Sequence, residues 1–276
     1  MSNTTPARKP FYPSGHHASV LRSHRQRTAE SSAPFLLPHL KATDSLLDIG
    51  CGPGSITITF APYVSRVVGI EHPSAGQPVL DAAAEDARAA SVQDKVSFQL
   101  ADALALPFPD DSFDVVYCHQ VLQHVPDAVG LLREMRRVSK RIVAAREADR
   151  GSFVLHPHDK AGFLAKFDEL WSAAARAGGG EPDAARRLKS WALAAGFSSG
   201  DVEVTTGSTC PDVKEWGEMW AERTVKTGFA TKVVELGLAS EAELDKIAAA
   251  WREWAYKPDA WTGYIQGDLL AWKKRE

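Results

Sequence analysis

A regular alternation of short apolar segments and amphipathic segments runs through the middle of this sequence. The apolar segments have the length and the β-branched content of buried strands. Five of them occur, at SLLDIG (45–50), RVVGIE (66–71), KVSFQLADA (95–103), FDVVYCH (113–119) and RIVAAREA (141–148). Strands that are joined through helices run parallel, because parallel neighbours need a crossover connection. The pattern predicts an α/β fold with a doubly wound parallel sheet.

The sequence after Ala148 keeps some strand signals but is richer in helical ones. DVEVTT (201–206) and GYIQGDLLAWKK (263–274) predict two more strands, so we expect a Rossmann-like, mostly parallel sheet of seven strands. Helical segments at about 152–180 and 212–256 are expected to form a lid over the carboxyl edge of the sheet, where open α/β sheets bind ligands. The expected organisation is an N-terminal arm and helix over 1–40, with the helix at His16–Leu40, followed by one domain over 41–276.

Charge and composition narrow the classes of function. The 276-residue chain has a formal net charge of −3, so it lacks the basic field that favours nucleic acid as a partner. No apolar run approaches the roughly 20 residues of a membrane span, and the start lacks the apolar core of a signal peptide. The three cysteines, Cys51, Cys118 and Cys210, form no CxxC pair. We expect a soluble cytoplasmic protein without a metal site or a membrane partner.

A glycine-rich turn follows the first predicted strand. The segment LLDIGCGPG places Gly50, Gly52 and Gly54 in a GxGxG spacing. Glycines at such a turn let backbone amides approach a ligand, although a tight strand-to-helix crossover alone would also need them. The spacing differs from the GxGxxG of dinucleotide-binding proteins, and the lysine and hydroxyl of a P-loop are missing. Phosphate is therefore not the ligand that the turn favours.

Three carboxylates stand at or beside the ends of adjacent predicted strands. Asp48 precedes the glycine turn, Glu71 ends the second strand and Asp102 ends the third. Asp48 could meet a ligand ammonium, Glu71 could accept the two hydroxyls of a ribose, and Asp102 could accept from an adenine amino group. Taken singly, Glu71 could cap a helix and Asp102 could satisfy a turn. Together, the three carboxylates favour a cationic nucleoside over a pyrophosphate.

From about Ser45 to Lys140 the sequence resembles the class I S-adenosylmethionine-dependent methyltransferases. Within them it is most similar to the ubiquinone/menaquinone C-methyltransferase-like group of small-molecule enzymes. The motifs that carry the resemblance are LLDIGCGPG, VVGIE and ADALALPFPDDSFDVVYCHQVLQHVPD, in the expected order. The resemblance implies that S-adenosyl-L-methionine is bound by Arg27, Asp48, Gly50, Cys51, Gly52, Glu71, His72, Asp102, Ala103 and His119.

The resulting hypothesis is methyl transfer to a small-molecule acceptor by in-line displacement in a lidded pocket, with S-adenosyl-L-homocysteine as the product. The sequence does not resolve whether the acceptor atom is oxygen, nitrogen, sulfur or carbon. His119 is the candidate catalytic residue, with contact to the cofactor favoured over proton transfer. One alternative is a non-catalytic relative that binds the cofactor. A nicotinamide-dependent oxidoreductase is a weaker alternative, because the GxGxG spacing and Asp102 argue against it.

Overall fold

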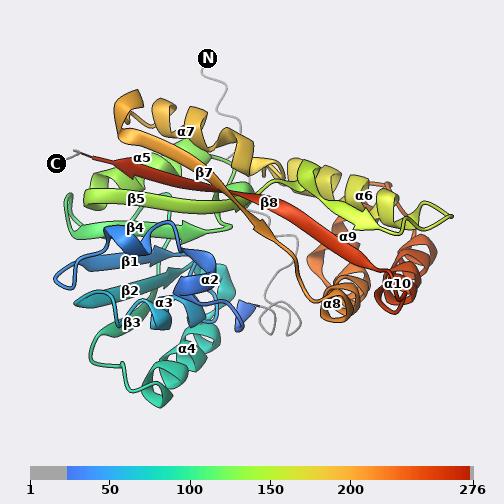
Figure 1. Ribbon diagram of the computed structural model, residues 1–276, viewed down its shortest axis with the longest axis horizontal. Helices are drawn as coiled ribbons and strands as arrows, with labels where there is room; N and C mark the ends of the chain where they lie inside the picture. The colour runs from blue at the N-terminus through green and yellow to red at the C-terminus, as the bar shows by residue number, and fades with distance from the viewer. Residues whose placement is uncertain (1–23, 274–276) are drawn as a thin grey trace.

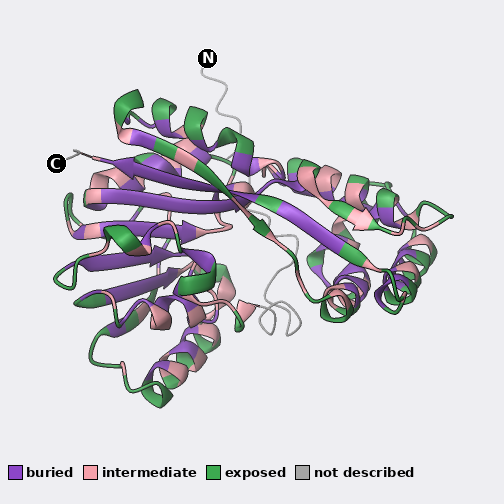
Figure 2. Ribbon diagram, in the orientation of Figure 1, coloured by how far each residue is buried: buried purple, intermediate pink, exposed green. Residues whose placement is uncertain are grey.

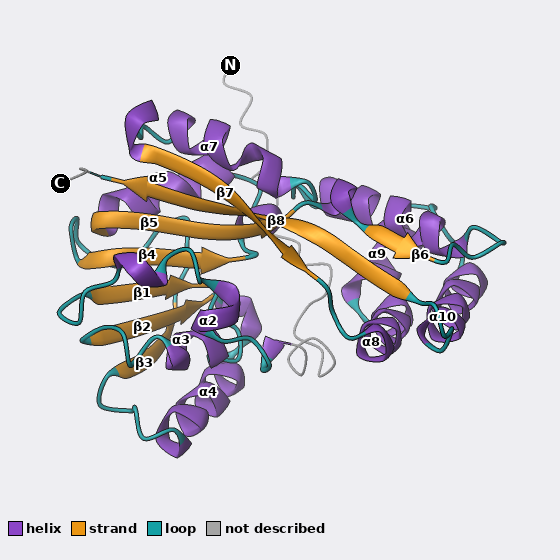
Figure 3. Cartoon of the chain, viewed as in Figure 1, coloured by secondary structure: helices purple, strands orange, loops and turns teal. Residues whose placement is uncertain are grey.

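The computed structural model describes residues 24–273, which form a twisted sheet with helices on both faces (Figures 1 and 3). Parallel strands lie in the order β3-β2-β1-β4-β5, and antiparallel β8 follows beside β5. Both β7 and β6 pair with β8 in antiparallel fashion. The strands are β1 (Ser45–Ile49), β2 (Arg66–Glu71), β3 (Val96–Leu100), β4 (Phe113–His119), β5 (Ser139–Ala148), β6 (Val154–His156), β7 (Val202–Thr209) and β8 (Trp261–Trp272).

The helices alternate with the parallel strands and then gather after β6. Within the described residues they are α2 (Ala29–Ser32), α3 (Ser55–Thr59), α4 (Gln77–Ala89), α5 (Ala128–Val138), α6 (Phe163–Ala177), α7 (Leu188–Ala194), α8 (Val213–Lys226), α9 (Gly228–Glu235) and α10 (Glu241–Ala255). A short 3-10 helix, η3 (Leu122–His124), follows β4. None of the helices within residues 24–273 combines the length and the apolar character that a membrane crossing requires.

Each central strand is buried on both faces, and alternate residues supply two separate cores. In β1, Leu47 and Ile49 face the core that also contains α5 and α7. Leu46 faces the opposite core, which contains α2 and parts of α3 and α4. Figure 2 shows the burial along these strands. This two-sided burial explains the continuous apolar runs in the sequence and confirms the doubly wound α/β fold.

A third core holds α6, α8, α9 and α10 together, and we call these four helices the helical subdomain. Aromatic rings fill this core: the Phe167 ring centroid lies 5.2 Å from that of Trp220, 5.4 Å from that of Trp251 and 6.1 Å from that of Trp171. The subdomain lies at one end of the long strand β8, away from α4 (Figure 1). Trp171, Trp220 and Trp251 therefore act largely as packing residues of this core.

Two features differ in detail from the sequence prediction. Strand β6 was not predicted, because three residues are too few to show a periodicity. The predicted helix at His16–Leu40 begins outside the described residues, and its later part was wrong: His24 is helical, but after it residues 25–40 form only α2 and a 3-10 helix at Leu37–His39. The Thr28 side chain caps a new helix at Ala29, and Pro34 prevents that helix from continuing.

Candidate active site

The glycine turn between β1 and α3 holds three residues with positive φ angles, at 71° for Gly50, 53° for Gly52 and 80° for Gly54. A Cβ at Gly50 would lie 2.5 Å from Val121 Cγ2, and a Cβ at Gly54 would lie 2.8 Å from the Phe98 ring. At Gly52 the nearest atom to such a Cβ would be His24 Nδ1, at 4.0 Å. Gly50 and Gly54 are therefore needed for packing, whereas Gly52 presents its backbone to open space.

That open space is a cavity of about 340 Å³ at the carboxyl edge of the parallel strands. We call it the first cavity. It is bounded by the ends of β1, β2 and β4, the segment after β3 and the segment before α2. All ten residues that the sequence predicted as cofactor-binding line it: Arg27, Asp48, Gly50, Cys51, Gly52, Glu71, His72, Asp102, Ala103 and His119. The fold thus brings together residues from four strand ends and from the N-terminal segment.

Asp48 is the most deeply buried carboxylate of the first cavity. Its side chain accepts a hydrogen bond of 2.6 Å from Thr57 Oγ1 on α3. Burial raises its pKa to about 7, with the neighbouring charge of Glu71 adding to the effect and the Thr57 hydrogen bond opposing it. Asp48 therefore titrates near neutral pH and would gain its charge most readily beside a cation.

Glu71 and Asp102 also make hydrogen bonds to the backbone. The Glu71 carboxylate accepts from Gly52 N and from His72 N, both at 2.8 Å, so it ties the glycine turn to the end of β2. Asp102 Oδ1 accepts from Leu104 N at 2.9 Å, which is the turn-satisfying contact that the sequence also allowed. Asp102 is exposed at the mouth of the cavity.

Arg27 contacts the end of β4 from the N-terminal segment. Its Nη1 lies 3.3 Å from His119 Nδ1, and its Nη2 donates to Gln120 Oε1 at 3.1 Å. Burial lowers the pKa of His119 well below its usual value, and the charges of Arg27 and Arg146 lower it further. Because arginine only donates, Nδ1 of the neutral imidazole accepts, and the ring hydrogen is on Nε2.

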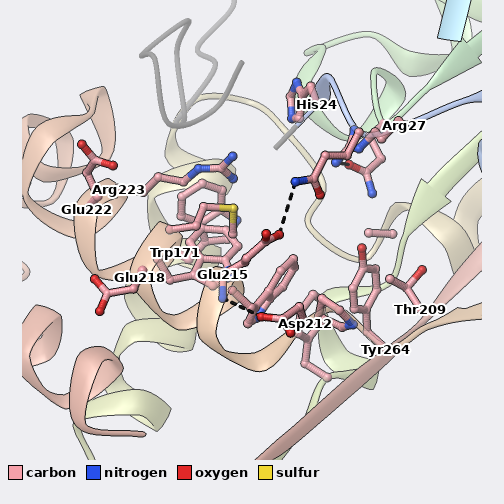
Figure 4. Close-up of a pocket in the computed structure, with 18 of the residues that line it drawn as sticks. His24, Arg27, Trp171, Thr209, Asp212, Glu215, Glu218, Glu222, Arg223 and Tyr264 are labelled. Atoms are coloured by element: carbon pink, nitrogen blue, oxygen red, sulfur yellow. Dashed lines mark hydrogen bonds between the residues drawn. The ribbon is translucent and has the colours of Figure 1, made fainter. Parts of the chain in front are cut away.

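A second cavity, of about 920 Å³, adjoins the first. Four residues line both: His24, Arg27, Gln120 and His124. The second cavity extends toward the helical subdomain, where α8 supplies much of its wall (Figure 4). The aromatic side chains that line it are Phe153, Trp171, Trp216, Trp220 and Tyr264.

Two supporting carboxylates near the site were not predicted from the sequence. Glu147 is fully buried at the end of β5 and accepts from Val121 N at 2.9 Å and Leu122 N at 2.8 Å, which fixes the segment after β4. Burial raises the pKa of Glu147 to about 8, although these backbone donors oppose the shift. Asp268 on β8 forms a buried bidentate pair with Arg146, at 2.6 and 2.8 Å. The only sequence signal for them was their place in or beside a predicted strand.

Histidine and carboxylate side chains are also the usual ligands of metal ions. Within residues 24–273, no group of three or more histidine, cysteine, aspartate or glutamate side chains is placed to hold a metal ion. His156, one of two nearby histidines in the sequence, lies 3.6 Å from Asp259 on the surface. The polar groups that line the first cavity are backbone amides, carboxylates, imidazoles and the Arg27 guanidinium, a set that can bind a polar organic ligand.

Comparison with known proteins agrees with this geometry. Residues 47–142 match the family model of the methyltransferase domain. The chain is 31% identical over 282 residues to an uncharacterized methyltransferase of Schizosaccharomyces pombe, C1B3.06c, with 96% of this chain and 97% of the relative covered. It is 33% identical over 287 residues to a probable methyltransferase of Aspergillus luteorubrus, ltbC, with 95% and 97% covered.

Among solved structures, the fold is similar to that of the YcgJ protein of Bacillus subtilis. The TM-score is 0.54 at 19% sequence identity, and the match covers 88% of this chain and 97% of that one. The similarity of the fold, the glycine turn at the edge of the sheet and the relatives that match along almost their whole length agree with one another. The chain belongs to the class I S-adenosylmethionine-dependent methyltransferases.

Proposed function

We propose that the protein transfers the methyl group of S-adenosylmethionine to a small-molecule acceptor, with the cofactor in the first cavity and the acceptor in the second. The observation that supports this assignment is the wall shared by the two cavities, at His24, Arg27, Gln120 and His124. In-line displacement requires donor and acceptor to meet at one point. The bound cofactor supplies a methyl group that is already activated on a sulfonium, so the chain has to align the reactants and exclude water.

The amino-acid end of the cofactor is assigned to the glycine turn. Gly50, Cys51 and Gly52 line that part of the first cavity, and Gly52 has no side chain to hold a ligand away from the turn. Asp48 is assigned to the ammonium group. Arg27 is assigned to the carboxylate, because its two hydrogen-bond partners are uncharged and leave its positive charge available.

The nucleoside end is assigned to the ends of β2 and β3. Glu71 is the proposed acceptor for the ribose hydroxyls, with His72 beside it. Its carboxylate already accepts two backbone N–H groups, and each carboxylate oxygen has a further lone pair for a hydroxyl. Asp102 and Ala103 are assigned to adenine, with the Oδ2 atom of Asp102 available while Oδ1 accepts from the backbone.

His119 is assigned to cofactor contact rather than to proton removal. Its Nδ1 accepts from Arg27, and its other ring nitrogen carries the hydrogen, so the imidazole has no free lone pair for a substrate proton. Burial also lowers the pKa of His24, and it lowers that of His124 to about 4. The wall shared by the two cavities therefore holds neutral imidazoles, which do not repel a sulfonium.

The helical subdomain is the proposed lid, with α6 in the segment 152–180 and α8 to α10 in the segment 212–256. Residues of α6, α8 and α10 line the second cavity beside residues from the sheet, which supports that role. We retain 1–40 as an N-terminal arm and 41–276 as the methyltransferase domain. Arg27 would then link the arm to the site.

The nature of the acceptor and the cellular location are also proposals. A cavity lined by side chains of the sheet and the helical subdomain and a net charge of −3 favour a small molecule over a nucleic acid. Cys51, Cys118 and Cys210 are all free thiols, which supports a reducing compartment and hence the cytoplasm. The methyltransferase relatives offer no support for the nicotinamide alternative.

Calorimetric titration with S-adenosylmethionine, S-adenosylhomocysteine and a nicotinamide dinucleotide tests the proposal. We expect binding of the first two only, and a loss of affinity of about 10- to 100-fold in Glu71→Ala. Glu85→Ala, on the exposed face of α4, is the matched control and should bind like the wild type. Failure of wild-type protein to bind either sulfur compound would overturn the proposed function.

A further inference from the structure

Arg150 is a buried cation in the wall of the second cavity. It begins a 3-10 helix, Arg150–Ser152, just after β5, and only 8% of the residue is exposed. Its Nε donates a hydrogen bond to Asp168 Oδ1 on α6. This ion pair fixes the guanidinium between the sheet and the helical subdomain.

Aromatic rings surround the same guanidinium. Its Cζ lies 4.7 Å from the Phe153 ring centroid, and 5.4, 5.5 and 5.2 Å from the ring centroids of Phe167, Trp171 and Trp220. Cation–π contacts of this kind hold an arginine in place without using its N–H groups. The rings therefore restrict the position of Arg150 without occupying the N–H donors of its guanidinium.

Nη1 and Nη2 of Arg150 have no hydrogen-bond acceptor among the described residues. Among residues 24–273, the hydrogen bond from Nε to Asp168 is the only one that the Arg150 side chain donates. Nη1 and Nη2 thus form a two-pronged donor with the spacing of a carboxylate. Trp216, which lines the same cavity, likewise has a buried indole N–H without an acceptor in the described part of the chain. The unmatched polar groups of this wall are donors, so a complementary ligand brings acceptors.

Four acidic residues line the cavity: Asp212 caps α8 by accepting from Glu215 N at 2.9 Å, and the Glu215 carboxylate extends into the cavity (Figure 4). Glu215 Oε2 accepts from Gln26 at 3.3 Å, Glu218 lies 3.7 Å from Arg252, and Glu222 lies 3.3 Å from Lys226. In Figure 4 the carboxylates of Glu218 and Glu222 point away from the centre of the cavity, whereas Arg223 is directed toward it. Arg223 is buried, with its Cζ 5.2 Å from the Trp220 ring centroid. The buried charges of this wall are therefore those of arginines.

We propose that Arg150 recognises an acidic group on the acceptor, and that the acceptor is a planar aromatic carboxylic acid. The flat rings of Phe153, Trp171, Trp216, Trp220 and Tyr264 would bind its apolar body, and the Nη1 and Nη2 atoms of Arg150 would bind its carboxylate. This inference rests on the proposed function, because it treats the second cavity as the acceptor site. It makes Arg150 a specificity-determining residue, while Asp168 positions the guanidinium.

Binding of a matched pair of probes tests the inference. The probes are 2-naphthoate and its neutral amide, 2-naphthamide, titrated by calorimetry into the full chain with and without saturating S-adenosylhomocysteine. We expect wild-type protein to prefer the carboxylate by about 10- to 100-fold, the range of a charge-assisted bidentate contact. Arg150→Gln should abolish that preference. Arg150→Lys, which keeps the charge but not the fork, should retain only a small part of it.

The control variant is Arg187→Gln, whose side chain is 55% exposed and lines neither cavity. It should keep the full preference. Equal affinity of the two probes for wild-type protein would overturn the inference, as would an unchanged preference in folded Arg150→Gln. A separate titration of S-adenosylhomocysteine into wild-type protein distinguishes the two claims. Failure to bind it refutes the proposed function, whereas equal affinity for the two probes in protein that does bind it refutes the role of Arg150.

Discussion

The Arg27 guanidinium donates a hydrogen bond to Nδ1 of His119 across 3.3 Å, so a residue from the N-terminal segment determines which ring nitrogen carries hydrogen at the end of β4. This contact joins a cation to an imidazole that burial already keeps neutral. Among residues 24–273, the partners of the Arg27 guanidinium are thus the uncharged side chains of His119 and Gln120. Both residues can be tested with one substitution.

Arg27→Met should weaken binding of S-adenosylmethionine by about 10- to 100-fold, because a charge-assisted contact to the cofactor carboxylate is lost. The pKa of His119 should rise, since the charge of Arg27 contributes to lowering it. Calorimetry measures the first effect and a nuclear magnetic resonance titration of the imidazole the second. The control is Arg25→Met, whose side chain is 52% exposed and lies 3.6 Å from Asp86. Unchanged cofactor affinity in Arg27→Met would contradict the assignment.

Cofactor binding should strengthen as the pH rises from about 6 to 8. Burial raises the pKa of Asp48 to about 7, so the side chain is largely neutral below that pH and charged above it. Only the charged form attracts an ammonium group. Asp48→Asn should bind S-adenosylmethionine more weakly at pH 8 and show a flatter pH profile. Calorimetry at several pH values measures both, and parallel profiles for the two proteins would exclude Asp48 as the source.

Two alanine substitutions in the glycine turn, Gly52→Ala and Gly54→Ala, should affect different properties: the first mainly cofactor binding, the second mainly the free energy of unfolding. Both positions have positive φ, which costs a non-glycine residue about 1 kcal/mol or more. Gly54→Ala should lower the free energy of unfolding further, because its Cβ would lie 2.8 Å from Ala83 Cβ and the Phe98 ring. Gly52→Ala meets nothing closer than 4.0 Å and should mainly weaken cofactor binding. Denaturant unfolding and calorimetry of both variants test this, and the reverse order of effects would contradict it.

Glu147 should make the wild type less stable as the pH rises. Burial raises its pKa from 4.5 to about 8, so between these values the folded chain keeps a proton that the unfolded chain has released. Its contribution to the free energy of unfolding is therefore present below pH 4.5 and falls as the pH approaches 8, by at most about 1.4 kcal/mol per pH unit. Glu147→Gln should lack this slope in urea unfolding measured from pH 5 to 8. Equal slopes for both proteins would show that Glu147 is ionised throughout.

The sequence predicted the parallel part of the fold because local patterns determine it. The bounds of β2 and β4 agree with the predicted strands at 66–71 and 113–119. Asp48, Glu71 and Asp102 were placed correctly at one edge because the carboxyl ends of parallel strands share that edge, and all three line the first cavity. Their binding roles remain predictions.

The helical segments led us to expect a lid, but the residues that line the second cavity could not be predicted, because they meet only in the tertiary structure. Arg150 follows β5 directly, but nothing in the local sequence shows that Asp168 and the Trp220 ring would enclose it. The same applies to Glu147, whose partners are backbone N–H groups after β4 rather than side chains with a recognisable pattern. Local periodicity reports which face of an element is buried and says nothing about which distant element covers it.

The pairing of β8 with three earlier strands has a consequence for folding during synthesis on the ribosome. Residues of β5, β6 and β7 all pair with β8, which is synthesised after them. Asp268, the partner of Arg146, arrives with the same strand. The parallel strands β1 to β5 can assemble while translation continues. Strands β6 and β7 cannot pair until β8 has been synthesised, so the part of the molecule around the second cavity folds later. Premature termination before Trp261 would therefore release a chain that has the parallel strands β1 to β5 but lacks the strand with which β6 and β7 pair.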